Sequence, residues 1–494
     1  MMRGKRIISM ILLAVMIVSF LPRDTFALSI TTPSQNVTSS KYFTALPGVY
    51  EMGDGYAVIW ATNFKGTGYI QYKYNGTTYT VYDMKNGIVR TGDTVHVVKV
   101  PYAHLQGNSY TVYSTEVTGH SYALTNYGTT VSAGPIKLKA YDGGSDFDIL
   151  VLTDTHGKKD WTVDVASRFS GDPDLVVFSG DIEDKLDEKS DIANMFNIMG
   201  TTTGGRYPIV YCRGNHEIRD VYSTALLEYF PTKTGEFYFD FTYGPLWAVV
   251  MDNGEDKEDT HEYYGNLANF KEYNTTQEAW LRSLRPNPNA TYRLSINHIP
   301  DIYKLPNNID LSDSVGHLGI QFAVSGHKHW SELYSVTRAD YRAKLGYETL
   351  ICGGYGANIA SWLKMSGDNV YITTKRGNNV TATNTSSANA SHHVDFNNYR
   401  VPLSKNKTGN PAALALPEYG TNNLFNPTVA SKGTVSLVTQ PAVFESGGDW
   451  YNVVWKTTDS GGKGVTGYVE YTYNGTTYQQ FEEVGGYRRT CDDF

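Results

Sequence analysis

The segment 147–157, FDILVLTDTHG, constrains the fold of this 494-residue chain more than any other. Its apolar, β-branched residues predict a buried strand, and Asp154, Thr155 and His156 follow directly. Because residues two apart in an extended chain point the same way, Asp154 and His156 can face one metal ion together. An isolated Asp-x-His is more often a polar loop after a strand, so the rest of the chain has to decide between the two.

The same pattern recurs along the middle of the chain. Apolar segments predict strands at 147–153, 175–179, 209–212, 246–251, 294–297 and 320–325. Helices are predicted at 161–169 and 189–199. This alternation predicts an α/β domain over 144–402, layered as two sheets with flanking helices.

Metal-ligand residue types follow most of these strands. After Asp154 and His156 come Asp181, Asp184, Asn215, His216, His298, His327 and His329. The carboxyl ends of strands are where an α/β sheet places its functional site. Neighbouring glycines allow sharp turns and bring backbone close to the ions.

The ordered blocks D-x-H, G-D-x-x-D, G-N-H-E, H and G-H-x-H resemble the calcineurin-like (dimetal) metallophosphoesterase superfamily. The resemblance implies two metal ions, with Asp181 bridging them. It implies that the first ion is held by Asp154, His156, Asp181 and His329. It implies that the second is held by Asp181, Asn215, His298 and His327. The chemistry of these residues is consistent with two bound metal ions. Carboxylate, amide oxygen and imidazole ligands suit Mn, Fe or Zn and not soft, thiophilic ions.

The implied reaction is hydrolysis of phosphate mono- or diesters by a hydroxide that bridges the two ions. The resemblance gives His216 the role of general acid or transition-state stabiliser at the leaving group, and Asp184 the role of orienting it. A purely structural His216 is the alternative. Glu217 is a candidate helix-start carboxylate, and Arg213 and Lys185 are candidates to hold phosphate oxygens.

Two departures narrow the family. A β-sandwich ahead of the catalytic domain resembles the purple acid phosphatase arrangement, but those enzymes have a tyrosine ligand where this chain has Asp184, and D-x-G at 154–156. The segment 180–184 also lacks the Gly-Ser continuation that is expected of a periplasmic 5′-nucleotidase. We therefore expect a non-purple exported phosphoesterase. The acidic loop 252–264 is expected to border its pocket and select substrate.

Strand and turn patterns fill the segment before the catalytic domain and return near the C-terminus. Residues 28–143 predict a fibronectin III-like antiparallel β-sandwich. GYIQYKYNGTTY at 68–79 is repeated as GYVEYTYNGTTY at 467–478. We therefore expect 428–494 to be an incomplete second copy of the sandwich. The Asn-, Gly-, Pro- and Ala-rich segment 403–427 is expected to be a linker.

The first 27 residues indicate export. Residues 1–6 are basic, 7–21 are apolar, and small residues precede a cleavage point after Ala27, which predicts a signal peptide over 1–27. An uncleaved membrane anchor is the alternative. We expect a secreted, extracellular protein that can associate with the cell surface. The net charge of −8 and the lack of a long basic run argue against a nucleic-acid-binding surface.

Two functions remain open from the sequence. The first is a secreted metal-dependent phosphoesterase. The alternative is a surface binding or adhesion protein whose fibronectin-like modules flank an inactive phosphoesterase domain. All seven ligand positions carry competent residues, which favours the enzyme. The sandwich modules would then contact a cell surface or polymer. The sequence does not select a substrate, because fold alone does not specify one.

Overall fold

The computed structural model describes residues 41–121, 124–264, 267–336, 345–378, 393–409, 435–447, 450–459, 465–484 and 487–488. The predicted signal peptide at 1–27 and most of the predicted linker at 403–427 lie outside these residues. Within them, no helix combines the length and the apolar character that crossing a bilayer requires.

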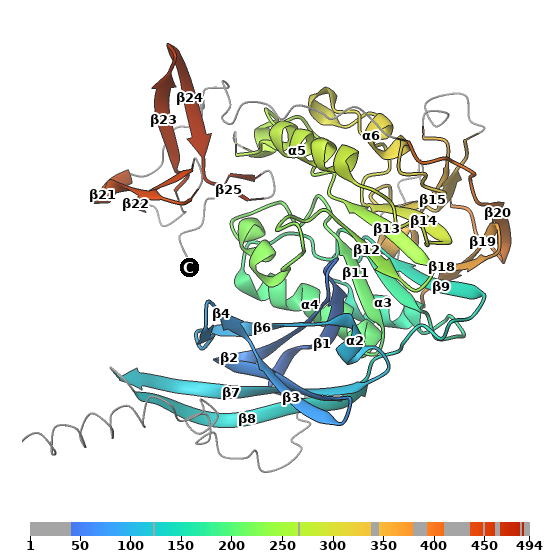
Figure 1. The fold of residues 1–494 in the computed structure, drawn as a ribbon, viewed down its shortest axis with the longest axis horizontal. Coiled ribbons are helices and arrows are strands. Elements are labelled where there is room, and N and C mark those ends of the chain that lie inside the picture. The colour runs from blue at the N-terminus through green and yellow to red at the C-terminus, as the bar shows by residue number, and fades with distance from the viewer. Residues whose placement is uncertain are drawn as a thin grey trace, which may run out of the picture.

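Two β-sheets pack against each other in the middle of the molecule (Figure 1). The first contains β9 (Asp146–Leu152), β10 (Leu175–Ser179), β11 (Pro208–Cys212), β18 (Ile359–Ser366), β19 (Asn369–Arg376) and β20 (Tyr399–Pro402). The second contains β12 (Phe239–Tyr243), β13 (Leu246–Met251), β14 (Tyr292–Asn297), β15 (Phe322–Ser325), β16 (Glu332–Tyr334) and β17 (Glu348–Ile351). Val151 and Val177 from the first sheet share a buried core with Ala248 and Ile296 from the second.

Helices cover the outer faces of both sheets. Side chains of α3 (Lys159–Ala166) and α4 (Lys189–Thr203) share a core with the far face of the first sheet. Side chains of α5 (Phe270–Ser283) and α6 (Ser312–Gly316) do the same on the second sheet. Short helical turns lie between strands at η3 (Ser223–Tyr229), η4 (Glu262–Tyr264), η5 (Pro306–Asn308) and α7 (Gly354–Ala357). The predicted two-sheet α/β layering is confirmed.

Antiparallel strands precede this layered domain. They are β1 (Phe43–Glu51), β2 (Tyr56–Tyr74), β3 (Thr77–Tyr82), β4 (Met84–Lys85), β5 (Ile88–Val89), β6 (Asp93–Val100), β7 (Ser109–Ser121) and β8 (Leu124–Lys137), with the short helix α2 (Tyr102–Leu105) after β6. Strand β2 is continuous over its 19 residues. Its first part pairs with β1 and β6, and its second part pairs with β3 and β7. The fibronectin III-like assignment stays a prediction.

Strand β1 joins these N-terminal strands to the first sheet of the layered domain. It pairs in parallel with β11, with Val49 opposite Pro208 and Tyr50 opposite Ile209. The fully buried ring of Tyr50 makes edge contacts with Phe196 of α4, at a centroid distance of 5.6 Å. Hydrogen bonds and core contacts therefore cross the predicted boundary at 143/144.

The repeated C-terminal sequence forms the same hairpin as its N-terminal copy. In β23 (Tyr468–Tyr473) and β24 (Thr476–Phe481), Tyr473 pairs with Thr476, as Tyr74 pairs with Thr77 between β2 and β3. Both turns are Asn-Gly with positive φ at each residue, which matches the right-handed twist of hairpin strands. A second hairpin is formed by β21 (Val435–Glu445) and β22 (Tyr451–Asp459), and a short one by β25 (Glu483–Val484) and β26 (Tyr487–Arg488). Every side chain of β21 is exposed.

Candidate metal centre

The predicted ligands follow five strands that end at one side of the two sheets. Asp154, Asp181 and Asn215 come after β9, β10 and β11, which run parallel. His298 comes after β14 and His327 after β15, which are also parallel. Parallel strands present their carboxyl ends at the same edge, so residues far apart in the sequence meet there.

One group of ligand atoms surrounds Asp154. Atoms of Asp154, His156, Asp181 and His329 all lie within 4.8 Å of one another. Nε2 of His329 lies 3.1 Å from Oδ1 of Asp154 and 3.1 Å from Nε2 of His156. These four residues are the ones that the sequence resemblance assigned to the first ion.

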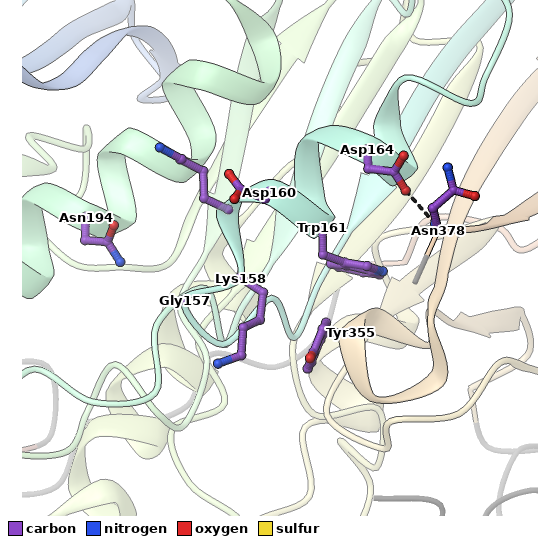
Figure 2. Close-up of a pocket in the computed structure, with 9 residues that line it drawn as sticks. Gly157, Lys158, Asp160, Trp161, Asp164, Asn194, Tyr355 and Asn378 are labelled. Carbon is purple, nitrogen blue, oxygen red and sulfur yellow. Dashed lines mark hydrogen bonds between the residues drawn. The ribbon is translucent and has the colours of Figure 1, made fainter. Parts of the chain in front are cut away.

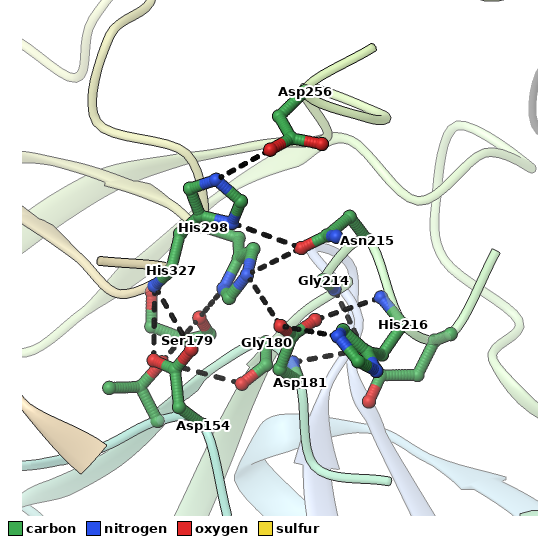
Figure 3. Close-up of polar contacts among 12 residues, drawn as sticks. Asp154, Ser179, Gly180, Asp181, Gly214, Asn215, His216, Asp256, His298 and His327 are labelled. Atoms are coloured by element: carbon green, nitrogen blue, oxygen red, sulfur yellow. Dashed lines mark hydrogen bonds and ion pairs between the residues drawn. The ribbon is translucent and has the colours of Figure 1, made fainter. Parts of the chain in front are cut away.

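A second group consists of Asp181, His298 and His327 (Figure 3). Nε2 of His298 is 3.1 Å from Oδ2 of Asp181. Oδ1 of Asn215 is 3.1 Å from Nε2 of His298 and 3.1 Å from Nδ1 of His327. The structure thus brings all seven predicted ligands together, with Asp181 common to both groups.

Surrounding groups fix the direction of these ligands. His298 donates an Nδ1–H hydrogen bond to the carbonyl of Ser179 at 2.6 Å, which leaves Nε2 facing Asp181. Asn215 donates from Nδ2 to Oε1 of Glu255 at 3.1 Å, which turns its Oδ1 toward the two histidines. Such outer contacts set the orientation of metal ligands.

Buried negative charge favours the binding of cations at this centre. Asp154 and Asp181 are 0% and 1% exposed. Burial alone would raise the pKa of Asp181, but the positive charge of nearby imidazoles, His298 first, holds that pKa well below its usual range. Burial would lower the pKa of His298, yet Asp181 raises it to about 10. The surroundings therefore favour a compensating positive charge between these side chains.

Backbone strain is concentrated at the same ligands. Asp154, His156, Asp181, His327 and His329 all have φ between 46° and 70°. Residues other than glycine rarely adopt this left-handed region, and each such residue costs about 1–3 kcal/mol unless local bonds compensate. Strain of this kind is typical of functional sites.

Two glycines are required by the close packing around the carboxylates. A Cβ on Gly214 would lie 2.2 Å from both the backbone nitrogen and Oδ1 of Asp181. A Cβ on Gly326 would lie 2.5 Å from Oδ2 of Asp154. The glycines in the sequence blocks are therefore needed for space beside the ligands.

His216 lies at the edge of the ligand groups. Its ring makes an edge contact with His156 at a centroid distance of 4.7 Å, and its Nε2 is 3.9 Å from Oδ2 of Asp181. His216 donates from Nδ1 to the backbone carbonyl of Asp184 at 2.6 Å. The carboxylate of Asp184 instead lies 2.8 Å from Nδ1 of His156. Asp184 thus orients His216 through its backbone, while its side chain orients a metal-ligand histidine.

Glu217 does not begin a helix, as the sequence suggested it could. Its fully buried carboxylate accepts hydrogen bonds from the backbone N–H groups of Asp181 (3.0 Å), Glu183 (2.9 Å) and Gly214 (2.8 Å), and also from Ile182. Burial, and then the charge of Asp181, raise the pKa of Glu217 to about 7. This side chain ties together the two loops that carry Asp181 and Asn215.

The two cations nominated for phosphate binding are engaged elsewhere. Arg213 is 2% exposed, and its guanidinium lies 2.6 Å from Asp252 and over the ring of Phe237. Lys185 extends along the surface and pairs with Asp187. Neither side chain is brought to the ligand groups.

The acidic loop predicted at 252–264 reaches the centre. Oδ2 of Asp256 lies 3.4 Å from Nε2 of His327. Oε2 of Glu255 accepts from Nη2 of Arg219 at 3.1 Å, and Nη1 of Arg219 donates to Nε2 of His216 at 3.2 Å. The sequence analysis did not identify Arg219 as a residue of the site. The only sequence signal for it is its position shortly after the G-N-H-E block.

A pocket is lined by residues that directly follow His156 in the sequence, Gly157 and Lys158 among them (Figure 2). Its volume is about 580 Å³, and its walls include Lys158, Trp161 and Tyr355. Lys158 is two residues after His156, and Tyr355 donates its backbone N–H to the carbonyl of Asp154 at 3.0 Å. The pocket is of the size that small organic ligands use, and it has polar and aromatic walls.

The residues of this centre fit bound metal ions. They offer carboxylate, amide and imidazole atoms, a donor set that suits Mn, Fe or Zn. The buried cysteines Cys212 and Cys352 are not part of either group.

Residues 147–331 match the family model of the calcineurin-like phosphoesterases. Over these residues the chain is similar to the calcineurin-like phosphoesterases.

Several solved structures are also similar to this chain. Purple acid phosphatase PPD1 from yellow lupin (Lupinus luteus) seeds aligns over 72% of this chain and 74% of its own, at 13% identity and a TM-score of 0.46. PhoD aligns over 69% of this chain and 87% of its own, at 12% identity and a TM-score of 0.46. The phosphopantetheinyl hydrolase of Mycobacterium tuberculosis covers 43% of this chain and 91% of its own, at 15% identity and a TM-score of 0.30. Curated proteins gave no match.

Proposed function

We propose that this protein is an exported phosphoesterase that uses two divalent or trivalent metal ions to hydrolyse phosphate mono- or diesters. The observation that carries the proposal is the pair of ligand groups that meet at the buried carboxylate of Asp181. Asp154, His156 and His329 would hold the first ion together with Asp181. Asn215, His298 and His327 would hold the second. Bound ions of this kind activate water and neutralise charge at phosphorus.

The protein's own residues then orient the substrate and handle the proton. Nδ1 of His216 is occupied by the carbonyl of Asp184, so Nε2 is the nitrogen that faces the ligand groups. In the proposed reaction His216 assists the leaving group with this Nε2. The pocket beside His156 gives the organic part of the ester a place to lie.

Export and surface contact are part of the same proposal. The basic, apolar and small-residue order of 1–27 supports a signal peptide. The N-terminal strands and the repeated C-terminal hairpin are proposed to contact a cell surface or polymer. N-terminal sequencing of the secreted protein tests the cleavage point, and we expect Leu28 to be its first residue.

The decisive experiment is hydrolysis of para-nitrophenyl phosphate beside bis(para-nitrophenyl) phosphate. Metal-stripped protein is re-supplied with Mn, Zn, Fe or Mg, and Asp181→Asn serves as the control. We expect metal-dependent turnover that the control lacks, and the ratio of the two rates identifies monoesters or diesters as preferred. Absence of turnover with every metal, in protein whose fold is verified by circular dichroism, would contradict the proposal.

A further inference from the structure

A cationic side chain can hold the phosphate of a substrate beside the metal ions, but the nominated cations are engaged elsewhere. Arg213 is buried against Asp252, and Lys185 pairs with Asp187. Lys257 is held between Glu255 and Asp256. Among the described residues, Arg219 is the cation that contacts His216.

We propose that Arg219 binds the substrate's phosphate. Glu255 orients the side chains of Arg219 and Asn215 for this binding. The inference rests on the proposed phosphoesterase function and deepens it, because it names the residue that recognises a tetrahedral oxyanion. Guanidinium groups recognise such anions well, since they present several N–H donors in one plane.

The guanidinium of Arg219 lies between Glu255 and His216. Nε and Nη2 of Arg219 donate to Oε2 of Glu255 at 3.2 and 3.1 Å. Nη1 is turned the other way and lies 3.2 Å from Nε2 of His216. Nε2 of His216 in turn lies 3.9 Å from Oδ2 of Asp181, the carboxylate common to both ligand groups. Arg219 therefore reaches the side of the centre where an ester oxygen and His216 would meet.

Glu255 links this cation to the second ligand group. Its side chain is fully buried, so its two oxygens are committed to neighbours. Oε1 accepts from Nδ2 of Asn215 at 3.1 Å, and Oε2 accepts from Arg219. One carboxylate thus sets both the direction of a metal-ligand amide and the position of the phosphate-binding guanidinium. Glu255 is a positioning residue, and Arg219 is the residue that touches substrate.

The two variants Arg219→Ala and Glu255→Gln separate these roles. Binding of inorganic phosphate to the manganese-loaded full chain is measured by isothermal titration calorimetry, and bound metal is measured by elemental analysis. Arg219→Ala should raise the Kd for phosphate about tenfold or more with metal content unchanged, because a charge-assisted hydrogen bond is lost. Glu255→Gln should raise that Kd and also lower the metal content, because one glutamine oxygen cannot accept from both Asn215 and Arg219.

A matched ion pair elsewhere provides the control. Arg282 and Glu278 lie one turn apart on α5, with Nη2 and Oε1 3.0 Å apart and both side chains about one-fifth exposed. Arg282→Ala should leave phosphate binding unchanged. Unaltered phosphate affinity in Arg219→Ala would overturn the inference, even if the wild type hydrolyses phosphate esters. Wild-type protein that binds phosphate through Arg219 without turnover would support the inference while overturning the proposed reaction.

Discussion

The carboxylate of Glu217 accepts a hydrogen bond from the backbone N–H of Asp181 at 3.0 Å. The same carboxylate accepts from Gly214 at 2.8 Å, so it joins the loop after β10 to the loop after β11. Each loop carries a predicted metal ligand, Asp181 on one and Asn215 on the other. The distance between these two residues is therefore set by a side chain that is not itself a predicted ligand.

Glu217→Gln should weaken both the fold and the centre. A glutamine replaces one acceptor oxygen with an NH2 group, which leaves buried backbone N–H groups without an acceptor. We expect the free energy of unfolding to fall by about 2 kcal/mol or more. Urea unfolding measures this change, and elemental analysis should show less bound metal. Glu188→Gln at the exposed start of α4 should have a smaller effect. Equal effects of the two variants would contradict the assigned role of Glu217.

Gly214→Ala should displace Asp181. The new Cβ would lie 2.2 Å from the backbone nitrogen and Oδ1 of that residue, so one of them has to move. We expect metal affinity to fall about tenfold or more, the scale seen when groups that orient ligands are lost. Gly316→Ala is the matched control, because nothing lies within 4 Å of its added Cβ. Titration of metal into stripped protein checks both variants, and an unchanged affinity in Gly214→Ala would count against the geometry.

The buried Glu51 should make stability depend on pH. Burial raises the pKa of this carboxyl from 4.5 to about 8, against hydrogen bonds from Tyr102 and Gly53. The folded state therefore holds this proton more tightly than the unfolded state, and the free energy of unfolding falls as pH rises from about 4.5 to about 8. The contribution is at most about 5 kcal/mol over that window.

Glu51→Gln isolates this contribution, because the amide stays neutral throughout. The difference in free energy of unfolding between variant and wild type should shift in favour of the variant between pH 5 and pH 8. Urea titrations across this range provide the measurement. A pH-independent difference would show that Glu51 is not the titrating group.

Tyr50→Ala should destabilise both the N-terminal strands and the catalytic domain. The ring is fully buried between Phe196 and Phe230, at centroid distances of 5.6 Å from each. Loss of a buried aromatic side chain costs about 3–5 kcal/mol. Calorimetry should show one transition that moves to lower temperature as a whole. Tyr127→Ala, at a 47% exposed position, is the control. A shift confined to one of two separate transitions would contradict a common core.

The candidate ligands could be identified from the sequence because their signal is local. Each one follows an apolar strand within a few residues, as Asp181 follows β10 and His298 follows β14. Strand pattern and ligand type together were enough to place them at one edge. The layered α/β fold was predictable for the same reason.

The supporting contacts were not predictable because they join distant segments. The partner of Arg213 is Asp252, and the partner of Asn215 is Glu255, about 40 residues away in each case. Neither pairing is visible in the local pattern of apolar and polar residues. The carboxylate of Asp184 contacts His156, not His216, because the backbone carbonyl of Asp184 already accepts from His216. The length of β2 also depends on distant partners, since its two parts pair with different neighbours.

The parallel pairing of β1 with β11 bears on how such proteins can diversify. A module connected only by a flexible linker can be exchanged by recombination without disturbing its neighbour. Here the leading segment supplies a strand to the first sheet of the layered domain and a tyrosine to its core. Recombination that replaced this segment with an unrelated module would leave β11 as an open edge. We therefore expect the leading segment and the enzyme to be inherited together.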